Sequence, residues 1–165
     1  FLKEERALIQ EGNSLVIYAL EKQFHVPIRL EEKKEELFLK GTVDRIDILN
    51  GVTRVVDYKT GSVTAADLAF SDWEELITDP KKSALFQALL YTYALRSDFN
   101  GESVITGIIP LKNFNTSFLI ASTNEIPRKR VPLKIDESSY AHFEQILFKL
   151  INEIFDPKKA FVQKI

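Results

Sequence analysis

The sequence predicts an α/β fold in which a central mixed β-sheet is flanked by helices. Two runs with strand-like alternation lie on either side of Asn50-Gly51, two later segments carry helical spacing, and further strand-like runs lie between them. The resulting order, α-β-β-β-α-β-β-α, is typical of helices packed on a mixed sheet. The chain has 165 residues, 45% of them hydrophobic and 28% charged. These values predict a single domain, residues 1–165, with its own core.

The first part of the chain predicts one helix followed by three strands. Apolar residues at helical spacing predict a helix over about residues 4–24, which residues 12–14 could interrupt or restart. Residues 26–32 predict a short strand. Residues 37–49 and 52–60 predict two longer strands, and the Asn-Gly pair between them is the strongest short signal for a hairpin with a two-residue type I′ turn.

The rest of the chain predicts alternating helices and strands. The last helix is amphipathic, and its start resembles a capping box. The expected elements are a short helix near 65–70, a clear helix over 81–97, strands over 103–111 and 116–122, an extended basic segment over 126–135 and a helix over 136–155.

The composition excludes several kinds of site. The net charge of −2 gives no overall basic character that would indicate nucleic acid, although a local basic strip would suffice. The lack of cysteine excludes a disulfide, a thiolate zinc site and a cysteine-ligated iron–sulfur cluster in this chain, and it is compatible with a cytoplasmic location. No apolar run is long enough to span a membrane and no signal peptide is visible. The chain begins with Phe1 and has no methionine, so we expect a piece of a longer protein.

The predicted turn also determines which residues of the hairpin face each other. If Asn50 and Gly51 form the turn, then, moving outward, Asp47 faces Arg54 and Asp44 faces Asp57. Alternation places Asp47 and Arg54 on one face of the hairpin, as a cross-strand ion pair together with Arg45 and Tyr58. The two remaining aspartates lie on the other face, among apolar residues.

Asp44 and Asp57 should therefore repel each other. Opposed side chains have Cβ atoms roughly 4.5–5.5 Å apart, where like charges are destabilising. Two carboxylates on a largely apolar face stay ionised together only if a positive charge lies between them. A divalent cation would supply it, and Lys59 adds a charged group on the same face. The alternatives are that each aspartate is a solvated strand residue, or that a β-bulge shifts one relative to the other.

Three motifs carry a family resemblance. They are GTVDRID at residues 41–47, VDYKTG at 56–61 and QALLYTYAL at 87–95. In these motifs the sequence resembles the PD-(D/E)XK nuclease superfamily, most closely the nuclease domains of RecB/AddB-type helicase–nucleases, with the pattern G-x-x-D-R-[IV]-D, D-[YF]-K-T-G and Q-x-x-x-Y. The resemblance covers about residues 1–160. It implies a restriction-endonuclease-like core. It also implies an Mg²⁺-dependent (or Mn²⁺-dependent) deoxyribonuclease of the exonuclease type. Such an enzyme would act in DNA repair or recombination, beside a helicase region of the same polypeptide or complex.

The resemblance also implies a role for each site residue. Asp44 and Asp57 would be metal ligands, and the backbone carbonyl of Tyr58 would complete the ligand set. Lys59 would position or polarise the attacking water and stabilise the charge that develops on the phosphate. Hard carboxylate and carbonyl oxygens suit Mg²⁺ or Mn²⁺, which can activate water for phosphodiester hydrolysis.

DNA contacts are expected from two sources. Gln87 and Tyr91, one helical turn apart, are implied by the resemblance to orient groups of the site and to contact the DNA backbone. A charge run is usually a solvated face, but several basic residues could also hold DNA. These are Lys81, Lys82, Lys112, Arg128, Lys129 and Arg130.

The sequence departs from the family pattern at the first helix. Many RecB/AddB-type nucleases carry a histidine ligand there in a pattern like G-x-x-x-H, whereas this chain has Val16 at about that place, which cannot bind a metal. His25 and His142 are interpreted as structural or solvated. Glu31 or Glu32 could substitute for the missing ligand, or could simply be a charged strand end.

Three functions stay open at this point. The first is an active metal-dependent nuclease. The second is a catalytically inactive nuclease-fold module that binds DNA or a partner domain, which the missing histidine favours. The third is a plain α/β scaffold, which leaves the opposed aspartates unexplained. We favour the first, because an idle site has little physical reason to keep two repelling carboxylates.

Overall fold

The computed structural model of the chain describes residues 2–29, 36–112, 118–126 and 129–160. Its helices are α1 (Leu2–Gln10), α2 (Glu75–Thr78), η1 (Pro80–Lys82), α3 (Ser83–Ala94), η2 (Arg96–Phe99) and α4 (Glu137–Ile154), where η marks a 3₁₀-helix. Its strands are β1 (Leu15–Ile28), β2 (Leu37–Leu49), β3 (Val52–Lys59), β4 (Ala69–Phe70), β5 (Ile105–Pro110), β6 (Leu119–Ile120), β7 (Ser122–Ile126) and β8 (Lys129–Pro132).

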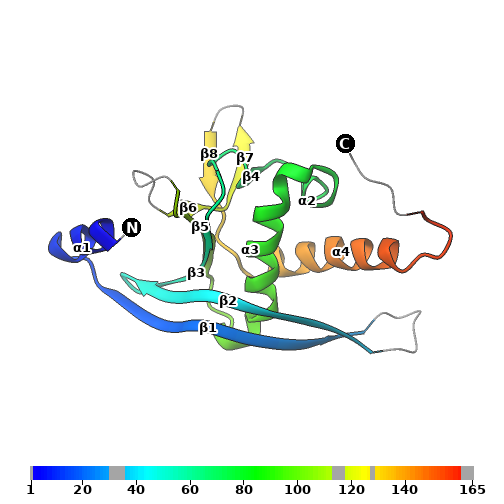
Figure 1. Cartoon of the computed structure of the whole chain (residues 1–165), viewed down its shortest axis with the longest axis horizontal. Coiled ribbons are helices and arrows are strands. Elements are labelled where there is room, and N and C mark those ends of the chain that lie inside the picture. Colours follow the sequence, from blue (N-terminus) through cyan, green and yellow to red (C-terminus); the bar gives the residue numbers. More distant parts are fainter. Residues whose placement is uncertain (1, 30–35, 113–117, 127–128, 161–165) are drawn as a thin grey trace.

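A five-stranded mixed sheet forms the centre of the fold, in the order β1-β2-β3-β5-β6. β3 and β5 run parallel, whereas the other neighbouring strands run antiparallel. A second sheet has the order β4-β7-β8. The helix α3 packs against the central sheet, while α1 and α4 lie towards opposite ends of the long axis (Figure 1). This arrangement confirms the predicted α/β class with a central mixed sheet flanked by helices.

The hairpin of β2 and β3 has the predicted register. Leu49 pairs with Val52, and Asp47 pairs with Arg54. Asn50 and Gly51 have φ angles of 51° and 81°, and a type I′ turn needs positive φ at both central residues. The chemistry of this turn therefore determines which side chains share a face of β2 and β3.

The helix predicted over about residues 4–24 is wrong beyond residue 10. α1 ends at Gln10, and residues 15–28 form β1, which pairs with β2 from Leu15–Leu49 to Ile28–Leu37. This run is rich in β-branched and aromatic residues, which suit a pleated surface. Pairing with β2 overrides the helical spacing of its apolar residues. The short strand predicted over 26–32 is in part the end of β1, and residues 30–32 lie outside the described residues.

The short helix predicted near residues 65–70 is also wrong. Residues 65–68 form a turn, and Ala69–Phe70 form β4. The ammonium of Lys82 donates hydrogen bonds to the carbonyls of Ala66 and Ala69, at 2.9 and 2.6 Å. Lys82 therefore satisfies these carbonyls from outside the segment, while the N–H of Ala69 closes a turn onto the carbonyl of Ala66 at 3.3 Å.

The later elements follow the prediction with shifted bounds. The helix predicted over 81–97 is α3 between two 3₁₀-helices, and the strand predicted over 103–111 is β5. The basic segment contributes β8, which pairs with β7. The last helix is α4, and Asp136 caps it by accepting a hydrogen bond from the backbone N–H of Ser139 at 3.0 Å.

The core holds α3 over β2 and β3. Ile46, Val55 and Leu85, one from each of these elements, are at most 1% exposed. Farther along β2, the ring of Phe24 lies against Gly41, where a Cβ atom would come within 2.6 Å of the ring. The same ring meets Tyr91 of α3 edge-on, with 5.9 Å between ring centroids. The missing side chain at Gly41 therefore lets β1 pack Phe24 next to α3.

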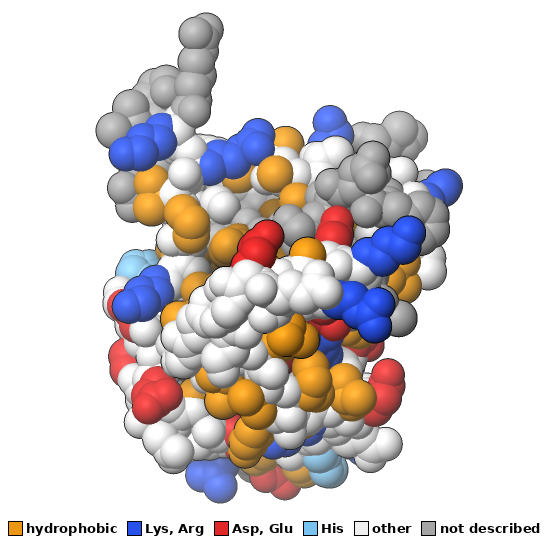
Figure 2. Space-filling model, turned by 90° about the vertical axis from the view of Figure 1, so that its left-hand side faces the viewer, with side chains coloured by type: hydrophobic (Ala, Val, Ile, Leu, Met, Phe, Trp, Pro, Cys, Tyr) orange, Lys and Arg blue, Asp and Glu red, His pale blue; other side chains and the backbone are white. Residues whose placement is uncertain are grey.

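The end of the molecule that carries α1 keeps apolar side chains exposed. Figure 2 faces this end and shows apolar side chains among acidic and basic ones. Ile9 of α1 and Val16, Tyr18 and Leu20 of β1 are each more than half exposed. Among the described residues, no helix has the length and apolar character needed to cross a membrane.

Candidate active site

The site lies where the ladder between β2 and β3 ends. The last paired residues there are Arg45 and Val56, one residue before Asp44 and Asp57. The backbone N–H of Tyr58 donates to Asp44 Oδ2 at 2.8 Å. The Asp44 carboxylate therefore takes over the accepting role that a strand carbonyl would have, while β3 continues in parallel pairing with β5.

Asp57 is a buried carboxylate with an incomplete set of partners. The residue is 3% exposed. No hydrogen bond within the described part of the chain reaches its Oδ2 atom, although Lys59 Nζ lies 3.0 Å away. Burial raises the pKa of Asp57 above its usual value; the hydrogen bond and charge of Lys59 oppose the rise, and the charge of Asp44 adds to it. The predicted repulsion between the two aspartates is therefore present at this position.

Lys59 connects the carboxylate of Asp57 to α3. Its ammonium lies 3.3 Å from Asp57 Oδ1 and donates to Gln87 Oε1 at 2.5 Å. Gln87 Nε2 in turn donates to the hydroxyl of Tyr91 at 2.5 Å. Since Gln87 and Tyr91 are one turn apart on the same helix face, a single helix orients the lysine from one side.

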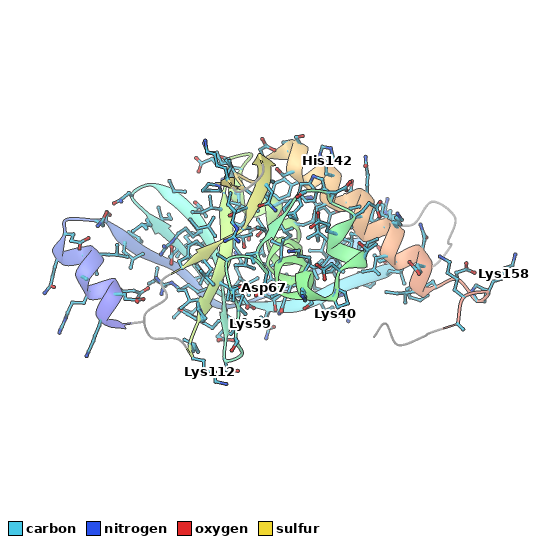
Figure 3. All side chains as sticks on the ribbon, turned by 90° about the horizontal axis from the view of Figure 1, so that it is seen from above. Lys40, Lys59, Asp67, Lys112, His142 and Lys158 are labelled. Carbon is cyan, nitrogen blue, oxygen red and sulfur yellow. The ribbon has the colours of Figure 1, made fainter. Side chains whose placement is uncertain are left out.

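The structure thus brings the predicted side chains into one group. They come from three elements: Asp44 from β2, Asp57 and Lys59 from β3, and Gln87 and Tyr91 from α3. Lys59 occupies one side of the molecule, away from His142, in the view of Figure 3.

The donor set of this group fits a hard divalent cation. The charge of Asp44 acts on Asp57 and raises its pKa, and the buried Oδ2 of Asp57 is ion-paired with Lys59 but accepts no hydrogen bond among the described residues. Bound Mg²⁺ or Mn²⁺ would satisfy an orphaned carboxylate oxygen and remove the repulsion between Asp44 and Asp57. Within the described residues, no group of three or more Asp, Glu, His or Cys side chains is placed to hold a metal. Further ligands from the described residues would therefore be neutral oxygen groups, such as a backbone carbonyl, together with water.

The two histidines have contacts of their own, and within the described part of the chain neither is bonded to Asp44 or Asp57. Val16 lies on β1 rather than on a helix, so the comparison with a helical histidine does not hold at this position. His25 contacts Phe38 with 4.4 Å between ring centroids. Nδ1 of His142 in α4 lies 2.7 Å from the carbonyl oxygen of Ser138, which can only accept, and the ring stacks on Trp73. Glu31 and Glu32 lie outside the described residues.

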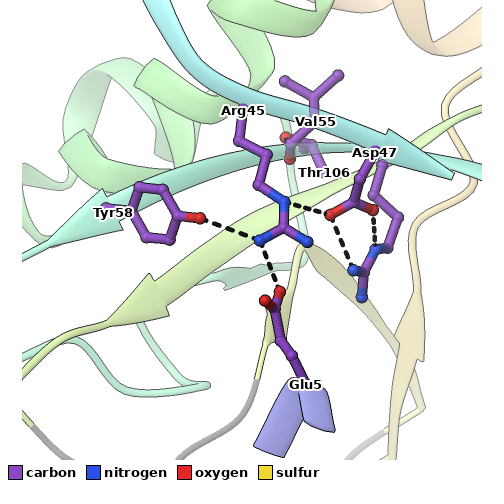
Figure 4. A network of polar contacts seen from close by, with 7 residues as sticks. Glu5, Arg45, Asp47, Val55, Tyr58 and Thr106 are labelled. Atoms are coloured by element: carbon purple, nitrogen blue, oxygen red, sulfur yellow. Dashed lines mark hydrogen bonds and ion pairs between the residues drawn. The ribbon is translucent and has the colours of Figure 1, made fainter. Parts of the chain in front are cut away.

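A buried ionic network supports the opposite face of the hairpin. Arg45 is 2% exposed, with Nε 2.7 Å from Asp47 and Nη1 2.5 Å from Glu5 of α1. Nη1 also donates to the hydroxyl of Tyr58 at 3.2 Å, and Arg54 donates twice to Asp47, at 2.5 and 2.9 Å (Figure 4). The predicted Asp47–Arg54 pair is thus confirmed, but it belongs to a larger network.

This network is a part of the site region that the sequence interpretation missed. It fixes Tyr58 and Arg45, the neighbours in sequence of Asp57 and Asp44, and it joins them to α1 through Glu5. Glu5 lies 40 residues before Arg45 on a separate element, so no local pattern marks the contact.

A second missed feature is the backbone of Glu21. This residue has a φ angle of 49°, in the left-handed region that non-glycine residues seldom adopt. It lies in β1 between the pairs Leu20–Arg45 and Lys22–Val43, and so opposite Asp44. Backbone outliers of this kind concentrate at functional sites. No sequence pattern marks this one.

The basic residues separate into different roles. Lys82 is 9% exposed and holds backbone carbonyls, so it is not available to DNA. Lys81 and Lys112 are exposed, as are Lys129 and Arg130 of β8. Arg128 lies outside the described residues.

Comparisons with known proteins agree with the motifs. The model of one family, described as the PD-(D/E)XK nuclease superfamily, matches residues 2–164. No curated protein matches the chain. The crystal structure of SSO0001 is similar with a TM-score of 0.32 and 13% sequence identity, over 97% of this chain and 67% of that chain. A likeness this weak carries no argument.

The family match spans nearly the whole chain and includes every element described above. The central five-stranded mixed sheet with flanking helices is consistent with the restriction-endonuclease-like core that the motifs imply. On this evidence, the chain belongs to the PD-(D/E)XK nuclease superfamily.

Proposed function

We propose that this chain is a metal-dependent deoxyribonuclease domain that hydrolyses phosphodiester bonds of DNA. The observation that supports it is the convergence of two carboxylates, a lysine, a glutamine and a tyrosine from β2, β3 and α3 into one connected group. A fold that needed these residues only for stability would have no reason to bury Asp57 near a second carboxylate.

In this proposal Asp44 and Asp57 hold Mg²⁺ or Mn²⁺, together with the backbone carbonyl of Tyr58. The bound cation would activate a water molecule and neutralise charge on the phosphate. The N–H of Tyr58 orients Asp44 through its hydrogen bond to Oδ2, which leaves Oδ1 of that carboxylate for the metal.

Lys59 positions the attacking water and stabilises the charge that develops on the phosphate. Its ammonium is held between Asp57 and Gln87, so it is oriented before the substrate arrives, and preorganised charges of this kind make a large contribution to catalysis. Gln87 and Tyr91 orient the lysine and contact the DNA backbone.

The motifs favour a more specific assignment within the superfamily. They favour an exonuclease of the RecB/AddB type that acts in DNA repair or recombination in the cytoplasm. Residues 1–165 would then be one nuclease domain of a longer protein, working beside a helicase region. These finer points rest on the resemblance of residues 41–47, 56–61 and 87–95.

Calorimetric titration with Mn²⁺, followed by addition of end-labelled DNA, tests the proposal. The unmodified chain should bind the metal and cleave DNA, and Asp57→Ala should lose both properties. Lys59→Ala should keep metal binding and lose cleavage by about 10²–10³-fold. Lys158→Ala is the matched control, because Lys158 is exposed and distant from Lys59 in Figure 3. Absence of metal binding by the unmodified chain would refute the metal-site assignment.

One observation favours a second candidate, an inactive nuclease-fold module that binds DNA or a partner domain. Among the described residues, no third acidic or imidazole side chain joins Asp44 and Asp57. Under this alternative the chain would bind DNA with similar affinity in the presence and absence of Mn²⁺ and would release no cleaved product. The same experiment therefore separates the two candidates.

A further inference from the structure

The helix α1 is held on the central sheet by an ion pair, with little apolar packing. None of its described side chains is buried. A cavity of about 230 Å³ lies between the helix and the sheet, lined by Glu5 and Leu8 on one side and by strand residues such as Leu49 and Ile109 on the other. The carboxylate of Glu5 lies 2.5 Å from Nη1 of Arg45 and so connects α1 to β2.

Glu5 also balances the charge of the buried network beneath α1. Arg45, Arg54 and Asp47 are all buried. Their two guanidinium groups and one carboxylate sum to one positive charge, and the carboxylate of Glu5 brings this sum to zero (Figure 4). A buried charge that loses its partner has a large desolvation cost. The charge of Glu5 therefore stabilises both the position of α1 and that of the Arg45 guanidinium group.

Arg45 connects Glu5 to Tyr58 of β3. The same Nη1 atom that lies next to Glu5 donates a hydrogen bond to the hydroxyl of Tyr58 at 3.2 Å. One nitrogen atom therefore holds a side chain of α1 and a side chain of β3. Lys59, the next residue of β3, points to the other face of the sheet, where it donates to Gln87 of α3. The network thus reaches the strand of the proposed site from the face opposite α3.

The backbone of Tyr58 belongs to the proposed metal site. Its N–H donates to Asp44 Oδ2 at 2.8 Å, and its carbonyl is the third proposed metal ligand. The hydrogen bond on the Tyr58 hydroxyl restrains the side chain, and with it the direction of both backbone groups. Hydrogen bonds that orient metal ligands from outside the ligand set matter for affinity, because their loss typically weakens metal binding by about 10–100-fold.

We propose that Glu5 is a positioning residue of the metal site, which acts through Arg45 on Tyr58, so that the docking of α1 determines how tightly the site holds its metal. This inference rests on the proposed nuclease function. It adds a contribution from α1, a helix that carries none of the three family motifs. Release of α1 would leave Asp44 and Asp57 in the chain, but the backbone of Tyr58 would lose its restraint from the opposite face.

Hydrogen exchange of the Tyr58 amide tests this connection without metal. NMR on the 165-residue chain in EDTA would follow exchange of the N–H that donates to Asp44. Glu5→Gln removes only the charge and Tyr58→Phe removes only the hydroxyl. We expect each to speed exchange of this amide by about fivefold, with little change at the amides of Ile46 and Val55. The matched control is Glu4→Gln, which makes the same change on the preceding residue of α1, where no ion pair with a described residue is lost.

Calorimetric titration with Mn²⁺ then measures the effect on the metal site. Glu5→Gln and Tyr58→Phe should each weaken Mn²⁺ binding by about tenfold, whereas Glu4→Gln should leave it unchanged. The double variant Glu5→Gln with Tyr58→Phe should also lose only about tenfold, because both substitutions break the same connection. If the two residues acted independently, their effects would multiply to about 100-fold, and that result would overturn the proposal. Circular dichroism of each variant would verify that the fold is retained.

Two further results would overturn the positioning role of Glu5. The first is equal Mn²⁺ affinity of Glu5→Gln, Glu4→Gln and the unmodified chain. The second is faster exchange of the Ile46 and Val55 amides to the same degree as that of Tyr58, because Glu5 would then only stabilise the fold. Failure of the proposed function looks different: an unmodified chain that binds no Mn²⁺ would refute the metal site itself, and this inference with it.

Discussion

Asp57 illustrates how one residue of the proposed site opposes stability. Burial raises the pKa of this carboxyl above the value it has in the unfolded chain, so folding favours its protonated form, and its charged form costs stability once the pH exceeds the raised pKa. A residue whose charge weakens the fold is expected where function requires that charge.

Replacing Asp57 by asparagine should therefore stabilise the chain near neutral pH. We expect Asp57→Asn to raise Tm by about 2–4 °C without metal. If the proposed metal site is present, Mn²⁺ should raise the Tm of the unmodified chain, and Asp57→Asn should abolish that rise. Scanning calorimetry with and without Mn²⁺ would measure both effects. Asp67→Asn is the opposite control: hydrogen bonds from Thr64 lower the pKa of Asp67, so its neutral replacement should lower Tm. A fall in Tm for Asp57→Asn would contradict the argument.

Asp47 shows the reverse behaviour, because its charge holds the fold together. It is fully buried and accepts hydrogen bonds from Arg54, while Arg45 lies 2.7 Å away. Asp47→Ala leaves two guanidinium groups without this partner, and we expect a loss of about 3–5 kcal/mol in the free energy of unfolding. Asp98→Ala removes only a partly exposed pair with Lys22 and should cost about 0–1 kcal/mol. Urea denaturation would measure the free energy of unfolding of both variants. If Asp47→Ala cost no more than Asp98→Ala, the buried network would not stabilise the fold.

At the scale of elements, the ribbon of β1 and β2 depends on a glycine. A Cβ atom at Gly41 would come within 2.6 Å of the ring of Phe24, so Gly41→Ala must push this ring away from Tyr91. We expect a loss of about 1–3 kcal/mol in the free energy of unfolding, measured by urea denaturation. Gly61→Ala is the control, since a Cβ there meets nothing within 4 Å. If both substitutions are neutral, Phe24 is not fixed by β2.

The stability of the helix α4 should depend on pH through the capping residue Asp136. Asp136 accepts from the backbone of Ser139, and this hydrogen bond lowers the pKa of Asp136. The ionised carboxylate of Asp136 therefore stabilises the fold at pH values above the pKa that it has in the unfolded chain. This stabilisation is lost as the pH falls through the lower pKa of the folded chain. Asp136→Ala should lower the free energy of unfolding by about 1 kcal/mol at pH 7, and the difference should shrink in strong acid. Asp136→Asn, which retains a capping oxygen, should lose less, and a pH-independent difference would argue against the cap.

At the scale of the whole molecule, the sequence predicts those features that local chemistry determines. Asn50-Gly51 sets the turn and thereby the faces of β2 and β3, so the shared face of Asp44, Asp57 and Lys59 follows from alternation alone. Gln87 and Tyr91 are likewise one helical turn apart in any helix. Whether this helix face meets Lys59 depends on tertiary packing, which periodicity does not reveal. The family motifs predict this contact, because they place Gln87 and Tyr91 in the same site as Lys59.

The features that the sequence does not reveal depend on contacts between distant residues. The apolar residues of β1 fit helical spacing as well as strand alternation, and only pairing with β2 decides between them. The contact of Glu5 with Arg45 and the left-handed backbone of Glu21 have no local signal either. The same is true of the contact between Phe38 and His25, because these rings meet only once β1 and β2 have paired.

The parallel pairing of β3 with β5 has a consequence for the order in which the chain folds. β2 and β3 are joined by a two-residue turn, whereas Asp57 of β3 pairs with Ile108 of β5, across a connection that contains α3. Closing so long a connection is slower than closing a hairpin. Pulsed hydrogen exchange during refolding should protect the amides of Ile46 and Val55 before that of Ile108, and simultaneous protection would contradict this order. Gln87 and Tyr91 lie within the slow connection, so a nascent chain with a finished hairpin would still lack the complete proposed site until β5 docks.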